Sequence, residues 1–219
     1  MRAAVRPHVD FLGGFMAEPL VAPLRRPNRS GFMAPFLVLE MVAAIGSAMG
    51  ADSLEEVLKE AQLYRLPDAD EPVREDKVAR LHQAMRRKWP DEAVAMSTRA
   101  GAEAGQRIME TQITTKAQGM LAKMPRATGA WLLAKTARQN AWTFSGSGEF
   151  VVESENRFIL RENPILVGET SEVMVCDFHA SLFERLFSTL IHPRLVCRET
   201  QCHARGDEAC VFEFTMSEA

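Results

Sequence analysis

The sequence predicts an α+β fold in which N-terminal helices pack on a four-stranded antiparallel sheet, built from two hairpins joined by a helix. Up to residue 141, apolar side chains recur mostly at helical spacing, whereas most later segments alternate apolar and polar residues as strands do. One helix-like segment, residues 173–191, interrupts these strands. Helices followed by hairpins around a crossing helix are typical of an α+β domain.

Length and composition set the limits of the domain organisation. The 219 residues are 47% hydrophobic and 25% charged, enough to bury one large or two small cores. We expect an extended arm at residues 1–30 and a single α+β domain at residues 31–219. Its helical part would cover residues 31–141 and its core residues 142–216.

Charge and hydropathy exclude several classes of protein. The net charge of −3 argues against a general nucleic-acid binder, because phosphate contacts need a concentrated basic face. The most apolar run, residues 34–50, is short for a membrane span and carries Glu40, so no transmembrane segment is expected. No secretory signal is recognised, which predicts a reducing, cytoplasmic location.

The first helices are predicted from their start and stop signals. Residues 34–50 are predicted to form a buried helix that Gly50 ends. Ser53 followed by Glu56 forms a capping box, which predicts a second helix at residues 54–63 that Pro67 stops.

Four further helices are expected before the strands. Residues 73–89 carry an apolar stripe, and residues 92–111 carry small residues along one face that would let another backbone approach closely. Pro125 separates two more helices, at residues 114–123 and 128–141. The small-residue face consists of Ala100, Gly101, Ala104 and Gly105.

The strand predictions rest on alternation and on turn residues. We expect a strand to begin at residues 142–144 and a hairpin to follow at residues 149–153 and 157–160. After the helix at residues 173–191, segments 195–202 and 210–216 form a second hairpin. Its loop contains Gly206-Asp207, a dipeptide typical of hairpin turns.

The second hairpin gathers residues that can hold a metal. Cys202 and Cys210 lie where its strands leave and re-enter the loop, Glu199 lies on its first strand, and Cys176 begins the preceding helix. Three thiols and a carboxylate suit a closed tetrahedral zinc site. The alternative is that these cysteines are buried small hydrophobes without a metal. Disulfides are not expected in a reducing compartment.

Several segments together carry a family resemblance. The domain resemblance covers residues 142–216, and the whole chain from about residue 36 resembles bacteriochlorophyll 4-vinyl reductases of the BchJ type, which belong to the 4-vinyl reductase domain family. The segments that carry it are AMSTRAGAEAGQRI, AWTFSGSGEF, CDFHASLFERLF and HPRLVCRETQCHARGDEACVFEF.

The resemblance has structural implications. The same domain occurs in phenol-responsive sensors, where zinc is held by Cys, Glu, Cys and Cys in the order that Cys176, Glu199, Cys202 and Cys210 follow here. Cys197 is then the spare thiol, unless it displaces Glu199. The family fold is also that of vesicle-tethering subunits, which implies an apolar ligand pocket and a homodimer formed through the N-terminal helices.

The function that the resemblance implies lacks part of its chemistry. Vinyl reduction needs a reductant, yet the sequence has no dinucleotide-binding fingerprint, flavin motif or iron–sulfur cysteine set, and no catalytic residue is predicted. We therefore expect the protein to bind a chlorophyll-pathway tetrapyrrole and to deliver it to bacteriochlorophyll biosynthesis enzymes. The alternatives are an 8-vinyl (4-vinyl) reductase of protochlorophyllide that uses external reductant, and a sensory module for a small hydrophobe.

Three residues are candidates for contacting the tetrapyrrole. His179, just after Cys176, is the candidate axial ligand of its metal, and Trp142 and Phe144 are candidates for stacking on the ring. The alternatives are that His179 lies on the helix surface or forms a hydrogen bond near the zinc, and that the aromatic residues belong to the core.

Overall fold

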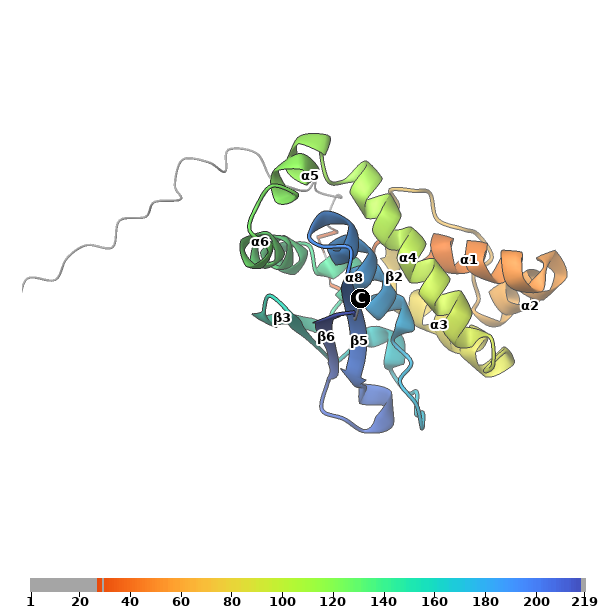
Figure 1. Ribbon diagram of the computed structural model, residues 1–219. Helices are drawn as coiled ribbons and strands as arrows, with labels where there is room; N and C mark the ends of the chain where they lie inside the picture. Colours follow the sequence, from red (N-terminus) through yellow and green to blue (C-terminus); the bar gives the residue numbers. More distant parts are fainter. Residues whose placement is uncertain (1–26, 29, 218–219) are drawn as a thin grey trace, which may run out of the picture.

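The computed structural model describes residues 27–28 and 30–217, so most of the predicted arm at residues 1–30 lies outside the described residues (Figure 1). The described residues form an α+β fold, as predicted. Within this part of the chain, no helix combines the length and apolarity that crossing a membrane requires.

The helical part follows the predicted order. A two-residue strand pair that the sequence did not predict, β1 (Phe32–Met33) with β2 (Val73–Arg74), ties the start of this part to the segment before α3. The helices are α1 (Phe36–Met49), α2 (Ala51–Glu60), α3 (Glu75–Lys88), α4 (Ala93–Thr111), α5 (Thr115–Leu121), α6 (Arg126–Gln139) and the short α7 (Trp142–Ser145).

Two predictions about these helices were wrong in detail. The capping box does not form: α2 already begins at Ala51, directly after Gly50, whose φ of 84° ends α1, and no side chain caps its N-terminus. Trp142 and Phe144 do not begin a strand, because they lie in α7. The backbone N–H of Gly146 closes this helical turn on the Trp142 carbonyl, and Gly146 then leaves it at a φ of 56°.

The sheet has the predicted two hairpins, with strand order β3-β4-β6-β5 and antiparallel pairing throughout. Its strands are β3 (Glu149–Ser154), β4 (Arg157–Arg161), β5 (Leu195–Gln201) and β6 (Cys210–Met216). The crossing helix α8 (Asp177–Leu190) begins later than the predicted residue 173. Two 3₁₀ turns, η1 (Pro164–Leu166) and η2 (His203–Arg205), complete the connections.

Helix α8 lies between the sheet and α4. Its Phe183 ring meets Phe158 and Phe212 of the sheet edge to face, with ring centroids 5.4 and 5.3 Å apart. On its other side, a Cβ added to Gly101 of α4 would lie 2.2 Å from the Phe178 carbonyl oxygen. The small-residue face of α4 therefore does what the sequence predicted, since it admits the backbone of α8.

Candidate metal centre and adjoining cavity

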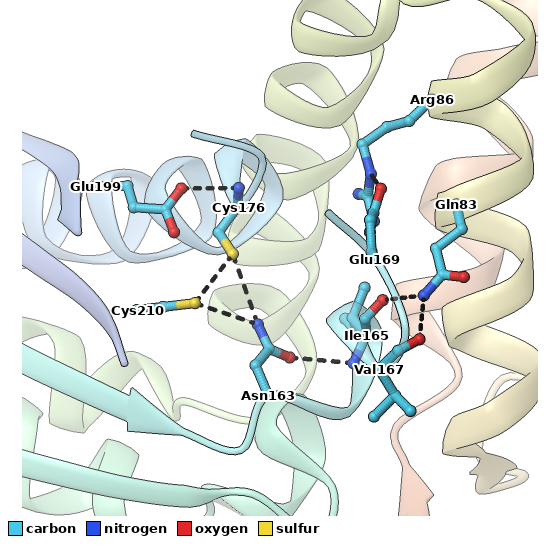
Figure 2. Close-up of polar contacts among 9 residues, drawn as sticks. All are labelled: Gln83, Arg86, Asn163, Ile165, Val167, Glu169, Cys176, Glu199 and Cys210. Atoms are coloured by element: carbon cyan, nitrogen blue, oxygen red, sulfur yellow. Dashed lines mark hydrogen bonds and ion pairs between the residues drawn. The ribbon is translucent and has the colours of Figure 1, made fainter. Parts of the chain in front are cut away.

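The four predicted metal ligands come together at the N-terminal end of α8. Cys176 is the residue directly before α8, Glu199 lies on β5, Cys202 follows β5, and Cys210 begins β6. One donor atom from each residue lies within 4.8 Å of all the others. Figure 2 shows the thiols of Cys176 and Cys210 pointing toward each other, with their sulfur atoms 3.5 Å apart. All four cysteines of the chain are free thiols, including Cys197.

The local fold of the second hairpin explains this convergence. Strand alternation would turn Cys202 away from Glu199, but a bulge between Glu199 and Gln201 shifts the register by one residue. The backbone N–H of Cys202 then donates to the Asp207 carboxylate over 2.8 Å, and Gly206 turns the loop at a φ of 93°. The bulge and the loop together bring Cys202 to the same side as Glu199 and Cys210.

Asn163 is a member of the site that the sequence analysis missed. Its side chain is buried, and its amide nitrogen donates to the sulfur atoms of Cys176 at 3.6 Å and Cys210 at 3.9 Å (Figure 2). Its amide oxygen accepts from the Ile165 backbone N–H. In the sequence, Asn163-Pro164 indicates only a loop, and nothing in the dipeptide signals a bond to sulfur.

Helix α3 fixes the loop that carries Asn163. The Gln83 amide donates to the backbone carbonyls of Ile165 at 2.9 Å and Val167 at 3.2 Å. Arg86 forms a largely buried ion pair with Glu169, its Nε lying 2.7 Å from a carboxylate oxygen (Figure 2). The amide beside the thiols is therefore positioned by the helical part of the protein.

The electrostatics of the cluster favour a cation. One carboxylate oxygen of Glu199 accepts the Cys176 backbone N–H over 2.8 Å, while the other is buried and has no hydrogen-bond partner in the described part of the chain. Burial raises the pKa of Glu199 to about 8. The thiols of Cys176 and Cys210 lower the pKa of Cys202, so the cluster holds one thiolate. A buried, unpartnered donor oxygen beside thiols is a structural feature that a bound cation would satisfy.

These distances can hold a tetrahedral metal ion. Zinc–sulfur bonds of ~2.3 Å place the sulfur atoms of a tetrahedral site roughly 3.8 Å apart. The separation of 3.5 Å between the sulfur atoms of Cys176 and Cys210 is close to this value. Cys197 is buried elsewhere on β5, where its backbone N–H donates to Glu184 and burial raises the pKa of its thiol. The Cys₃Glu set can hold a metal without Cys197.

A small apolar cavity of about 40 Å³ lies between α4, α6, α7 and α8. Phe144 and Phe183 line it, and Phe144 also stacks edge to face on Phe183 with centroids 5.3 Å apart. The cavity residues that the argument uses are Ile108, Leu133, Ala137, Phe144, Phe183 and Leu186.

The three predicted pigment-contacting residues differ in their surroundings. Phe144 faces the cavity, whereas Trp142 is half-buried and does not line it. His179 is buried behind Phe144, and its Nε2 donates to the Phe144 backbone carbonyl over 3.0 Å. Burial lowers the pKa of His179 to about 4, so the imidazole is neutral at pH 7. In this arrangement His179 ties α8 to α7.

Comparison with known proteins then places this architecture in a family. The family profile of the 4-vinyl reductase domain matches residues 156–216. The Bacteriochlorophyll synthase 23 kDa chain of Cereibacter sphaeroides is 34% identical over 183 residues, which cover 83% of this chain and 89% of that protein. This chain belongs to the same BchJ-like family. The protein of the same name from Rhodobacter capsulatus is 30% identical over 182 residues, covering 82% and 85% of the two chains.

Family membership confirms the resemblance seen in the sequence. The residues that match the 4-vinyl reductase domain include Asn163 and all four candidate metal ligands. Helices α4, α6 and α7, which supply much of the cavity wall, precede the matched residues. The candidate metal centre thus lies within the matched domain, and the cavity lies between that domain and the preceding helices.

Solved structures show the fold of this family member. An H-NOX protein from K. algicida aligns with a TM-score of 0.55 at 10% identity, over 85% of this chain and 98% of that one. A variant of the T. tengcongensis H-NOX protein aligns with a TM-score of 0.52 at 12% identity, over the same shares. The fold is therefore H-NOX-like. The predicted likeness to vesicle-tethering subunits and phenol sensors stays a prediction.

Proposed function

We propose that the protein binds a chlorophyll-pathway tetrapyrrole in the cavity between α4, α6, α7 and α8, and delivers it to enzymes of bacteriochlorophyll biosynthesis. The observation that carries the proposal is an apolar, aromatic-walled cavity in a chain whose relatives are named for bacteriochlorophyll synthase. One H-NOX structure with a TM-score of 0.52, at 12% identity, is titled for heme distortion, so a protein of this fold holds a related macrocycle.

The cavity must open to admit such a ligand. Its volume of about 40 Å³ is far below the ~300 Å³ or more of pockets that enclose drug-sized molecules. Helix α6 is the wall best suited to move, because it meets the interior mainly through the small residues Gly129, Ala130 and Ala134, with Leu133 as the bulky exception. An outward shift of α6 enlarges the cavity while the sheet and α8 stay packed.

The ligand-contacting residues follow from this location. Phe144 lies in the cavity wall and is placed to stack on the ring, and Trp142, two residues earlier in α7, would join it only after α6 moves. Axial ligation by His179 would require its bond to the Phe144 carbonyl to break. We therefore assign His179 a role in which ligand binding and the position of α7 are linked.

The metal centre is proposed to hold a structural zinc ion. Cys176, Glu199, Cys202 and Cys210 supply three sulfur donors and one oxygen, and the unpartnered oxygen of Glu199 supplies the fourth bond. When bound, zinc would crosslink the start of α8 to the second hairpin. Four protein donors fill a tetrahedral shell, so zinc here serves stability. A homodimer and a cytoplasmic location complete the proposal.

The binding proposal is tested by titrating purified protein with protoporphyrin or divinyl protochlorophyllide. Binding is expected to red-shift the pigment absorbance and to quench its fluorescence at micromolar concentrations. Ala137→Phe fills the cavity and should abolish the shift, whereas Ala127→Phe, at an exposed position of the same helix, should retain it. Unaltered pigment spectra with the wild-type protein would refute the proposal.

Vinyl reduction is the second candidate, favoured by the match to the 4-vinyl reductase domain. Converting a vinyl group to an ethyl group consumes two electrons and two protons, which an external donor such as NADPH or a partner reductase must supply. The test is to incubate divinyl pigment with protein, donor and pathway enzymes, and to separate the products by chromatography. A monovinyl product that depends on this protein would support the reductase, and its absence would leave the binding role. No observation favours the sensory module.

A further inference from the structure

Residues 111–148 have an unusual charge distribution. No Asp or Glu occurs between Glu110 and Glu149, although the chain as a whole has a net charge of −3. The same stretch contains five basic residues: Lys116, Lys123, Arg126, Lys135 and Arg138. It spans α5, α6 and α7. The charges of this segment are therefore of one sign, and the metal centre does not use them.

The outer face of α6 combines these charges with an exposed indole. Trp131, Lys135 and Arg138 are spaced at i, i+4 and i+7, so they share one solvent-facing stripe. The Trp131 side chain is 51% exposed, and the Lys135 ammonium lies 5.1 Å from its ring centroid. Helices α5 and α6 lie at the side of the molecule opposite to α1 and α2 (Figure 1).

Basic residues elsewhere on the surface usually have acidic partners. Lys59 pairs with Glu55, Arg65 with Glu71 and Arg87 with Glu60. Among the described residues, by contrast, no carboxylate pairs with Lys123, Arg126, Lys135 or Arg138. An ordinary solvated helix face interleaves both signs of charge. This face, which we call the α6 basic face, presents cations without neutralising partners.

We propose that the α6 basic face binds the surface of an anionic lipid bilayer. Lysine and arginine are attracted to anionic headgroups, and tryptophan prefers the membrane–water interface, where its ring is partly buried and its N–H stays hydrated. Trp131, Lys135 and Arg138 supply both features on one stripe. The binding is peripheral and reversible, because the stripe carries a single large apolar side chain.

The opposite face of α6 gives this placement a consequence. Leu133 and Ala137 of the same helix line the cavity, so a docked α6 would separate the cavity from the lipid by the width of one helix. A lipophilic ligand dissolved in the bilayer could then enter when α6 moves. The inference goes beyond the proposed ligand binding, and its test needs no pigment.

The test is sedimentation of the full-length protein with vesicles of phosphatidylcholine alone or with ~30 mol% phosphatidylglycerol. Binding is expected only to the anionic vesicles, and it should weaken as salt rises from ~0.05 to ~0.5 M. Each cation near the surface contributes roughly fivefold, so Lys135→Gln/Arg138→Gln should weaken binding about 30-fold. The blue shift of tryptophan emission on adding vesicles should be lost in Trp131→Phe.

Matched controls separate this surface from net charge. Arg99→Gln/Arg198→Gln removes the same charge from exposed positions on α4 and β5 and should leave binding unchanged. Equal loss in both double variants, or no binding to anionic vesicles at low salt, would overturn the proposal. Polyglutamate tests the other occupant: if it binds the α6 basic face and vesicles do not, the partner is an acidic protein and the membrane proposal is wrong.

Discussion

The close approach of α4 to α8 at Gly101 can be tested by a single methyl group. An alanine Cβ there would lie 2.2 Å from the Phe178 carbonyl oxygen and 3.1 Å from the Leu182 backbone nitrogen. Both neighbours are backbone atoms of α8, so no side chain can rotate away. The two helices would have to separate by roughly 1 Å, and forcing extra atoms into a packed interior costs about 1–3 kcal/mol, occasionally more.

Gly119→Ala is the matched control for Gly101→Ala. Gly119 also lies within a helix, α5, but a Cβ added there meets nothing within 4 Å. The change should stabilise the protein by about 0.5–1 kcal/mol, because alanine favours helix and narrows the unfolded ensemble. Since Gly101→Ala gains the same backbone term, a net loss of about 2 kcal/mol would reflect a larger steric cost.

Urea and thermal unfolding followed by circular dichroism measure both variants. At this chain length a loss of about 2 kcal/mol lowers the melting temperature by roughly 4–8 °C. The start of α8 would also shift, so Gly101→Ala should retain metal less well than Gly119→Ala. If Gly101→Ala is as stable as Gly119→Ala, the helices do not pack as closely as described, and the account of the small-residue face fails.

Three further predictions concern the site and the core. Asn163→Asp keeps the oxygen that accepts from Ile165 but replaces the N–H donor to the thiols with a charge, so zinc retention in a chelator competition should fall about 10- to 100-fold; unchanged retention would remove Asn163 from the site. The buried imidazoles predict acid sensitivity, because burial lowers the pKa of His82 to about 3 and that of His179 to about 4, whereas both titrate near 6.5 when unfolded. The unfolded state therefore binds more protons below pH 6.5, and each imidazole should cost about 1.4 kcal/mol of stability per pH unit as the pH falls toward these values; His82→Gln should roughly halve this slope in urea titrations, and an identical slope would contradict the assignment. Arg86→Gln leaves the Glu169 carboxylate buried without its cation and should destabilise by roughly 3 kcal/mol, and adding Glu169→Gln should recover part of the loss; additive losses in the double variant would mean that the pair is not coupled.

The hairpins and long helices could be predicted because their residues alternate or repeat at one period. The strand expected at residues 142–144 was wrong for a different reason. Trp142 and Phe144 favour strands when read alone, yet the Phe144 carbonyl accepts from His179 and its ring packs on Phe183. Both partners lie more than thirty residues further along the chain. Tertiary contacts therefore decide the local conformation, and a local pattern cannot report them.

The metal cluster shows the same division between local and distant information. Cys202, Cys210 and Glu199 belong to one hairpin, so their proximity follows from sequence spacing and strand pairing. Asn163 reaches the cluster only because α3 holds its loop through Gln83 and Arg86, which lie about eighty residues earlier. Neither the bulge after Glu199 nor this anchoring leaves a sequence signal, so the donors were predictable and their hydrogen-bonded support was not.

Helix α8 connects the metal centre to the cavity. Cys176 precedes its first turn, Phe178 and His179 lie in that turn, and Phe183 and Leu186 line the cavity within the next two turns. The backbone contact at Gly101 prevents α8 from moving toward α4, and the aromatic contacts of Phe183 hold it on the sheet. A metal that fixes Cys176 would therefore set where the cavity wall stands. Because these contacts do not tie α6 to the framework, α6 is the cavity wall through which a ligand can enter, while the metal holds the opposite wall in place.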